Sequence, residues 1–239
     1  MASINTNMSA TLAVSNLNKT TDEMTSVLTA MSSGKAINSA SDDAAGLAVY
    51  TAMSVDYAAW EQAGDNAEVA TAILETADGG LSEIADILER MYELASQASS
   101  GSVTDTERAY LDDEFQELIS QVDSIVESTT YFDTSLLDGT YDENFTVSAD
   151  ASATAISVTI GTDYDSTGLG IAAADVTTST TAAAALTLIE TAIETVSAGR
   201  ASVGAMMSRF DYAAGNIETA KTNLESAMSV YMDADIAQL

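Results

Sequence analysis

The chain has 239 residues and no Pro, Cys or His, and its 37 Asp and Glu against 7 Lys and Arg give a formal charge of −30. Without Cys or His it lacks disulfides, thiolate metal sites and the commonest general base, so no enzyme and no catalytic, cofactor or metal site is predicted. The charge would repel a nucleic-acid backbone or an anionic membrane surface, and neither is an expected partner. The absence of Pro, which breaks helix interiors, favours long helices.

Apolar residues at helical spacing predict a first helix over residues 3–32. Its stripe comprises Ile4, Met8, Leu12, Leu17, Thr21, Met24, Leu28 and Met31. Gly34 follows as a helix stop. Ser39 with Asp42 and Asp43 forms a capping-box pattern, which predicts that a second helix begins near residue 42.

The second helix is predicted to run to about Ser99, with a heptad in its later half. The heptad positions are Leu81, Ile84, Leu88, Met91, Ala95 and Ala98. Gly64, Gly79 and Gly80 each cost a helix about 1 kcal/mol relative to Ala, so a break or bend could occur at these positions.

A third helix is predicted from the capping box of Thr104 and Glu107 to about Ser128. Its heptad positions are Leu111, Phe115, Leu118, Val122 and Ile125. Because a short turn joins it to the second helix, the two are expected to form an antiparallel hairpin.

A polar region rich in Gly, Ser, Thr and Asp follows, and it contains two short β-branched runs, at 145–147 and 155–160. The runs predict a small β-hairpin. Its acidic pairs, such as Asp163 with Asp165, lack calcium-loop spacing and are interpreted as solvated loops. Candidate modification sites are an N-glycosylation pattern at Asn144 and hydroxyls for O-glycans at Thr177, Thr178 and Ser179.

The last segment has the strongest periodicity, seven heptads with only two polar positions. These positions are Leu186, Ile189, Ile193, Val196, Arg200, Val203, Met207, Phe210, Ala214, Ile217, Lys221, Leu224, Met228 and Tyr231. Such a pattern predicts a long coiled-coil helix. The predicted fold is mainly α, an elongated antiparallel bundle of the N- and C-terminal segments with a small β-hairpin region.

Several ordered motifs make the chain resemble bacterial flagellin from residue 2 to about residue 237. They are Ile4-Asn-Thr-Asn7, the run from Ser32 to Ala48, Leu74-Glu-Thr-Ala-Asp-Gly-Gly-Leu-Ser-Glu-Ile84, Glu93-Leu-Ala95, Leu136-Leu-Asp-Gly139 and Arg200-Ala-Ser-Val-Gly204. The resemblance implies an extracellular subunit that polymerises with itself into the flagellar filament for swimming. It also implies export through the flagellar apparatus with a chaperone, and contact with the filament cap and hook-associated proteins.

The resemblance divides the chain into four segments. Residues 1–40 would form the N-terminal helix of the inner tube, 41–135 the first part of the rod, 136–181 a short variable hairpin region and 182–239 the long C-terminal helix. This would be a minimal flagellin without large outer domains. The family continues past the Asp-Ala-Asp at 233–235 with another amphipathic helix, so that inner-tube helix is expected to be missing or truncated here.

The region from residue 90 onward resembles the part of flagellins that an animal toll-like receptor recognises. The matching residues are Arg90, Glu93, Leu94, Gln97 and Glu114. Arg90 and Leu94 are four residues apart on a helix and so could share one contact face. The alternative is that Leu94 packs in the core and Arg90 pairs with Glu93 or Glu89.

Other functions remain open from the residues alone. A hook-filament junction protein of the same superfamily shares the terminal motifs, and a non-polymerising acidic helical adhesin would share the bundle. The acidic residues are crowded into residues 54–143, where the only cations are Arg90 and Arg108. Like charges on neighbouring subunits repel unless salt screens them, so filament assembly is expected to require salt.

Overall fold

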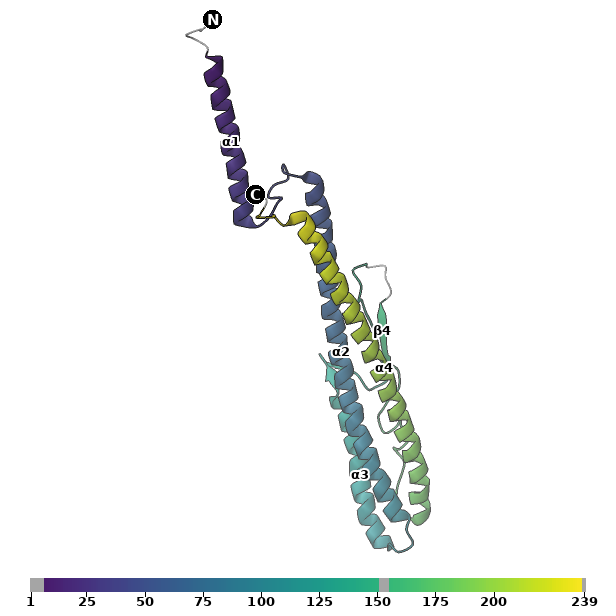
Figure 1. The fold of residues 1–239 in the computed structure, drawn as a ribbon. Helices are drawn as coiled ribbons and strands as arrows, with labels where there is room; N and C mark the ends of the chain where they lie inside the picture. Colours follow the sequence, from purple (N-terminus) through teal and green to yellow (C-terminus); the bar gives the residue numbers. More distant parts are fainter. Residues whose placement is uncertain (1–6, 151–154, 238–239) are drawn as a thin grey trace. The chain divides into compact units, whose positions relative to one another are not determined.

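Four helices dominate the structure, a computed structural model that describes residues 7–150 and 155–237. The helices are α1 (Met8–Ser33), α2 (Ala44–Ser99), α3 (Asp105–Ser128) and α4 (Ser179–Met232), and the short strands are β1 (Thr130–Tyr131), β2 (Thr134–Ser135), β3 (Tyr141–Phe145) and β4 (Ile156–Ile160) (Figure 1). The predicted class, a mainly α bundle with a small β region, is confirmed. Residues 3–6 of the predicted first helix lie outside the described residues.

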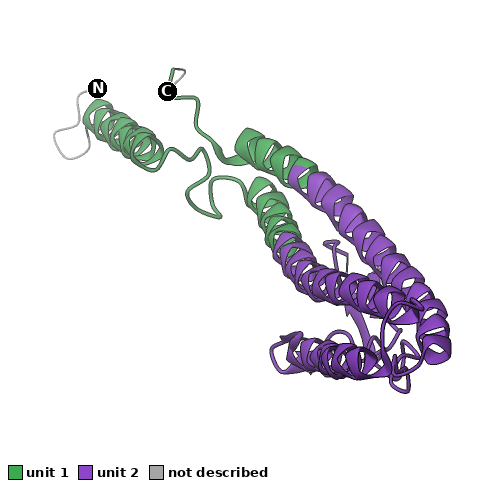
Figure 2. Ribbon diagram, turned by 90° about the horizontal axis from the view of Figure 1, so that it is seen from below, with its two compact units in different colours: residues 1–61, 219–239 green, residues 62–218 purple. Residues whose placement is uncertain are grey.

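The chain forms two compact units, and α2 and α4 each contribute to both (Figure 2). Unit 1 comprises residues 1–61 and 219–239, and unit 2 comprises residues 62–218. Unit 2 contains α3, both hairpins and most of the buried apolar residues.

The core of unit 2 is built on one face of α2, which we call the α2 seam. Its members alternate by four and three residues and are all at most 2% exposed: Ala63, Ala67, Ala70, Leu74, Ala77, Leu81, Ile84, Leu88, Met91, Ala95 and Ala98. The predicted heptad from Leu81 is therefore confirmed, and it extends back to Ala63. The N-terminal half is nearly all Ala, which permits close approach of a second helix.

Helix α4 packs antiparallel to α2. The Ser179 hydroxyl donates to the Ser99 carbonyl at 3.1 Å, and the Arg200 guanidinium donates to the Asp78 carboxylate at 2.9 Å. Further along, Ile217 is the side chain that faces Gly64. Residues near the start of α4 thus contact the end of α2, and residues further along α4 contact earlier parts of α2. The two helices therefore stay paired along the whole of their length in unit 2.

As far as Ile217, one row of the predicted α4 heptad is confirmed and the other lies one residue earlier. Beyond Ile217 the prediction fails, because Leu224 is only partly buried and Tyr231 is exposed. The confirmed row is fully or almost fully buried: Ile189, Val196, Val203, Phe210 and Ile217. The second buried row contains Ala185, Ala192 and Met206, while Leu186, Ile193 and Met207 are only partly buried. In the first half of α4 the second row thus buries alanines, and their larger neighbours Leu186 and Ile193 lie at its partly exposed edge.

Helix α3 returns along α2 as the predicted antiparallel hairpin. Thr104 and Glu107 form the predicted capping box. Arg108 is buried, and its guanidinium donates to the carbonyls of Ala98 at 2.8 Å and Ser100 at 3.0 Å and to the Asp105 carboxylate at 2.8 Å. One arginine thus satisfies the last carbonyls of α2 and fixes the turn.

The region between α3 and α4 contains two antiparallel hairpins. In the larger one, Tyr141 pairs with Ile160 and Phe145 pairs with Ile156. The predicted first strand at 145–147 is wrong, because the strand ends at Phe145 and begins at the buried Tyr141. The ring of Phe145 packs edge-on against Phe210 of α4 at 5.9 Å, which fixes the hairpin on the bundle.

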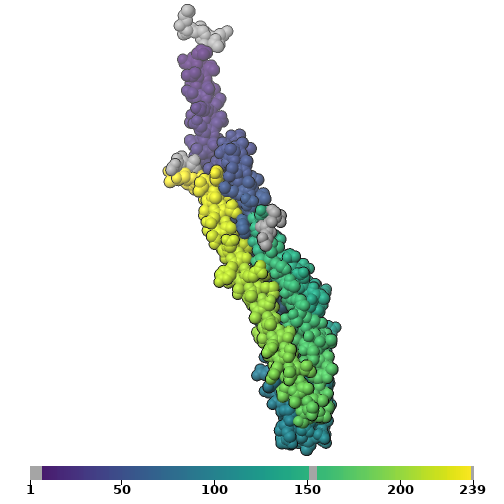
Figure 3. Space-filling model, turned by 90° about the vertical axis from the view of Figure 1, so that its right-hand side faces the viewer, coloured from purple at the N-terminus to yellow at the C-terminus, as the bar shows by residue number. Residues whose placement is uncertain are grey.

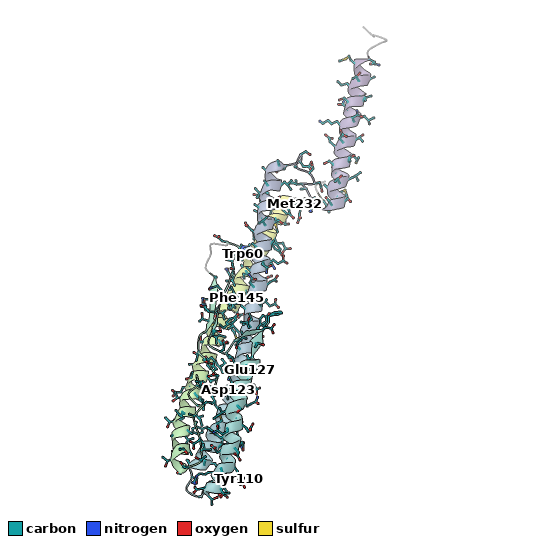
Figure 4. All side chains as sticks on the ribbon, turned by 180° about the vertical axis from the view of Figure 1, so that it is seen from behind. Trp60, Tyr110, Asp123, Glu127, Phe145 and Met232 are labelled. Atoms are coloured by element: carbon teal, nitrogen blue, oxygen red, sulfur yellow. The ribbon has the colours of Figure 1, made fainter. Side chains whose placement is uncertain are left out.

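The segment from β4 to α4 follows α3 and is fixed by side chains of that helix. The Asp123 carboxylate accepts from the Ser166 amide at 2.7 Å and hydroxyl at 3.0 Å, and the Asp112 carboxylate accepts from the Val176 amide at 2.9 Å. Figure 4 labels Asp123 on α3, and Figure 3 shows the segment beside α4. Carboxylates of α3 thus satisfy backbone amides of this irregular segment that have no partner in a helix or a strand.

The glycines of α2 do not interrupt the helix, which is continuous from Ala44 to Ser99. Gly79 has open space where a Cβ would be. A Cβ on Gly80 would lie 2.7 Å from the Thr129 hydroxyl and 2.9 Å from a Leu137 methyl group. The predicted break is wrong, and Gly80 provides the space for the end of α3.

These adjacent glycines give a matched test of this packing. Gly79→Ala should raise the free energy of unfolding by up to about 1 kcal/mol, because Ala is the better helix former. Gly80→Ala should lower the free energy of unfolding by about 1 to 2 kcal/mol, because the close contacts of the added Cβ with Thr129 and Leu137 outweigh that gain. Urea unfolding followed by circular dichroism measures both. Equal effects of the two substitutions would contradict the tight contact.

Candidate self-association surface

Helix α1 presents an uncovered apolar stripe over residues 14–31, and further apolar side chains, Met8 and Leu12, are exposed on the other side of its first turns. The exposed large apolar side chains are Met8, Leu12, Val14, Leu17, Met24, Leu28 and Met31, each between 51% and 73% exposed. Ala30 is the buried residue of this helix. A patch of this kind on a subunit marks an interaction surface, because exposed apolar area is costly in water.

Helix α1 also carries little charge. Its ionisable residues are Lys19, Asp22 and Glu23, and the Lys19 ammonium lies 3.8 Å from the Glu23 carboxylate. In a chain of charge −30, the apolar stripe thus coincides with a region where other copies meet little electrostatic repulsion.

The end of α1 is fixed within unit 1 by backbone hydrogen bonds. Gly34 ends the helix with φ at 71°, which is the left-handed region that glycine adopts without strain. The Ala36 amide donates to the Met232 carbonyl at 2.6 Å, and the Ala234 amide donates to the Gly34 carbonyl at 3.0 Å. The end of α1 is therefore tied to the end of α4.

The start of α2 is capped differently from the predicted pattern. The Asp43 carboxylate accepts from the amides of Ala45 and Gly46, both at 3.0 Å, and is the cap. The Asp42 carboxylate accepts from the amides of Asn38 and Ser39, which lowers its pKa, the Ser39 hydrogen bond being the larger cause. The predicted capping box is therefore wrong in detail: Asp42 closes a turn with Asn38 and Ser39, and Asp43 caps α2.

Most of the few cations have partners inside the subunit. Arg90, Arg108 and Arg200 form ion pairs with carboxylates, and Lys221 lies 5.5 Å from the centre of the Tyr57 ring. These contacts use four of the seven cations within the chain, so most of its 37 carboxylates have no cation to compensate their charge.

The residues of the receptor prediction fall into two groups. The Arg90 guanidinium bridges Glu114 at 2.8 Å and Glu93 at 2.9 Å, and these contacts, that to Glu114 first, raise its pKa. Arg90 and Glu114 are about half exposed, whereas Leu94 is 1% exposed and packs in the core of unit 2. A partner could reach the ion pair on the surface, and the receptor contact itself stays a prediction.

The residues of the glycosylation prediction are all exposed. Asn144 lies on β3, while Thr177, Thr178 and Ser179 precede or begin α4. The Thr177 hydroxyl donates to the Asp175 carboxylate at 2.7 Å, and the Ser179 hydroxyl donates to the Ser99 carbonyl. Glycans at these positions stay a prediction.

The acidic pairs considered for cations serve as local turn acceptors. The Asp163 carboxylate accepts from the Asp165 amide at 3.1 Å, and the Asp165 carboxylate accepts from the Gly168 amide at 2.6 Å. Within residues 7–150 and 155–237, no three carboxylates lie together as a metal ion would need.

One exposed feature was missed from the sequence. The hairpin of β1 and β2 has a two-residue tip, Phe132 and Asp133, with positive φ angles of 47° and 63°. Such a turn usually contains Asn-Gly or Asp-Gly, so no sequence signal indicated it. The Phe132 side chain is 88% exposed, and its ring meets Tyr131 edge-on at 4.8 Å. A left-handed conformation at a bulky residue costs about 1 to 2 kcal/mol.

None of the helices, as far as the structure describes them, has a stretch long and apolar enough to cross a membrane.

Comparisons with known proteins agree with these features. The family model of the bacterial flagellin N-terminal helical region matches residues 4–142, and that of the C-terminal helical region matches residues 186–238. A flagellin of Halalkalibacterium halodurans is 34% identical over 236 residues, which cover 98% of this chain and 87% of the relative.

Two solved structures are similar in fold. The crystal structure of Bacillus cereus flagellin matches with a TM-score of 0.58 and 29% identity, over 69% of this chain and 94% of that one. A putative flagellar hook-associated protein from Vibrio parahaemolyticus matches with a TM-score of 0.67 over 80% of this chain and 99% of that one, but at 15% identity it shows the fold alone. The two family models and the nearly full-length relative settle the family: the chain is a bacterial flagellin, a structural subunit of the flagellar filament.

Proposed function

We propose that the subunit polymerises by burying the apolar stripe of α1 against the same helix and the terminal segments of neighbouring copies. The observation that carries this proposal is a 26-residue helix with seven exposed large apolar side chains and one buried residue. An isolated helix of this kind gains little from packing, so its stability must come from partners. Because α1 carries little charge, it can pack against the same helix of another copy with little electrostatic repulsion, although the chain as a whole is acidic.

The role is structural, without catalysis. Export through the flagellar apparatus with a chaperone, an extracellular location, and contact with the filament cap and hook-associated proteins belong to the same proposal and follow from the family. Residues 1–40 take the inner position and residues 136–181 the outer one. The junction-protein alternative has in its favour the fold likeness to a hook-associated protein, without supporting identity in sequence.

Substitution of two stripe leucines tests the role of α1. Leu17→Asn with Leu28→Asn should raise the critical concentration for filament formation at least about a hundredfold, because each leucine contributes about 1.5 kcal/mol or more when buried. The matched control is Ser15→Asn with Ser26→Asn, which lie on the face of the helix opposite Leu17 and Leu28. Sedimentation and negative-stain microscopy give the critical concentration. Loss of assembly in the control, or normal assembly in the leucine variant, would overturn the proposal.

Salt should control assembly strongly. At low ionic strength the uncompensated carboxylates of neighbouring copies repel over about 30 Å, whereas at 1 M salt the screening length is about 3 Å. We expect long filaments in high salt and loss of filaments on dialysis to about 10 mM salt, as measured by light scattering. Filaments equally stable in both buffers would contradict the charge argument.

The receptor proposal rests on the exposed Arg90 and Glu114 pair. Arg90→Ala should reduce toll-like receptor signalling by the monomer while the unfolding midpoint changes little, because the ion pair is half exposed. Arg209→Ala, an exposed arginine on α4, is the control for loss of charge. Unchanged signalling by the folded Arg90→Ala variant would refute this contact.

A further inference from the structure

The tip of the β1–β2 hairpin projects an aromatic side chain into solvent. Phe132 is 88% exposed, and both tip residues have left-handed backbone conformations that a non-glycine residue adopts at a cost. Strained residues of this kind occur where the surrounding structure imposes them, and they cluster at contact sites. The strands beside the tip hold it in this conformation, with Tyr131 paired to Thr134.

Unit 2 has an uncharged hollow between β4 and α4, which we call the β4–α4 hollow. Its volume is about 330 Å³. Apolar groups of Ile160, Val203 and Met206 line it together with hydroxyl groups of Thr162, Thr195 and Ser202. In a chain of charge −30, a hollow without any ionisable lining except a tyrosine is unusual. An aromatic ring would find apolar contact in this hollow. The hydroxyls of Thr162 and Ser202 could donate hydrogen bonds to a carboxylate, whereas the Thr195 hydroxyl already donates to the Thr191 carbonyl at 2.9 Å.

A second hollow, of about 370 Å³, lies between α2 and α4 and is unsuitable for the same tip. Tyr92 and Ile193 line it, but Glu89, Glu190 and Glu194 do so as well. The Tyr92 hydroxyl already donates to the Glu190 carboxylate at 3.2 Å. Insertion of Phe132 would bring the Asp133 carboxylate among three others, and like charges at short range repel. Between these two hollows of unit 2, charge therefore favours the β4–α4 hollow.

The tip and this hollow lie on opposite sides of unit 2. Figure 1 shows the β1–β2 hairpin, in teal, on one side of α2, and β4 on the other side beside α4. A tip on one side cannot enter the hollow of its own chain. A projection and a hollow on different faces of one subunit make a head-to-tail contact, which repeats into an open polymer instead of closing as a dimer.

We propose that Phe132 of one copy inserts into the β4–α4 hollow of a neighbouring copy in the filament, with Asp133 accepting hydrogen bonds from the hydroxyls of Thr162 and Ser202. This contact rests on the proposed polymerisation and adds to it a second interface, distinct from α1. It explains why the hairpin keeps a bulky residue where Asn or Gly would fit with less strain.

Disulfide trapping tests the contact directly, because the chain has no Cys of its own. The variant Phe132→Cys with Ser202→Cys, assembled in high salt and oxidised, should give a ladder of cross-linked oligomers on a non-reducing gel. Each single variant should stay monomeric on the same gel. The control Tyr110→Cys with Ser202→Cys, which uses an exposed aromatic position elsewhere on unit 2, should give no ladder.

The failures of the two proposals are distinguishable. Filaments that microscopy shows to be intact but that give no ladder in the double variant would overturn the tip contact alone. Cross-linked dimers from Phe132→Cys by itself would also overturn it, because two tips would then meet each other. Absence of wild-type filaments would instead overturn the proposed polymerisation, and the tip contact with it.

If the double cysteine variant fails to assemble, the contact can be tested by changing the charges at positions 202 and 133 instead. Ser202→Asp places a carboxylate opposite Asp133 and should raise the critical concentration about tenfold or more. Adding Asp133→Lys should restore it to within a few-fold of the wild type. Ser208→Asp adds the same charge to α4 outside the hollow and should have little effect. Equal effects of the two serine variants, or no rescue by the lysine, would overturn the contact.

Discussion

Close approach of α4 to the alanine-rich half of the α2 seam is the constraint on which the rest of unit 2 depends. Ala63, Ala67 and Ala70 leave room for the row of α4 that ends in Phe210 and Ile217. With this pair in register, α3 returns along the leucine-rich half of the seam, and the Phe145 ring packs against Phe210. The irregular segment after β4 then has two fixed helices against which to pack, and α3 supplies its hydrogen bonds. The absence of Pro keeps α2 and α4 unbroken over the 56 and 54 residues that this register requires.

Helix α1 obeys a different constraint. It has the apolar spacing of a packed helix but only one buried residue, so the chain separates folding of unit 2 from the interactions of α1. The charges are also distributed unequally between α1 and the rest of the chain. The few charges of α1 include a Lys–Glu pair, whereas the acidic residues concentrate between 54 and 143. Screening by salt would let the acidic faces approach, and the apolar stripe would then supply the favourable free energy of association.

Local signals in the sequence predicted much of this fold. The Thr104 capping box, the seam from Leu81 to Ala98 and the α4 row from Ile189 to Ile217 need only residue types and spacing. Long-range contacts could not be predicted in this way. The second α4 row buries Ala185 and Ala192 instead of the neighbouring Leu186 and Ile193, a choice that depends on the packed neighbours and not on the local apolar pattern. Asp112 and Asp123 looked like ordinary surface carboxylates until the structure placed the amides of Val176 and Ser166 beside them. The tip at Phe132 lacks the glycine that indicates such a turn. For the candidate self-association surface, the sequence predicted the apolar spacing of α1 but not that these side chains are exposed.

The central claim is that the α2 seam folds the subunit, while the helix α1 gains the packing that protects it from opening only in the polymer. Amide hydrogen exchange, followed by mass spectrometry on monomer and on filament, tests it most directly. The account predicts that amides of residues 63–98 exchange slowly in both states, and that amides of residues 8–33 exchange fast in the monomer and slowly in the filament. Slow exchange of α1 in the monomer, or fast exchange of α1 in intact filaments, would contradict it.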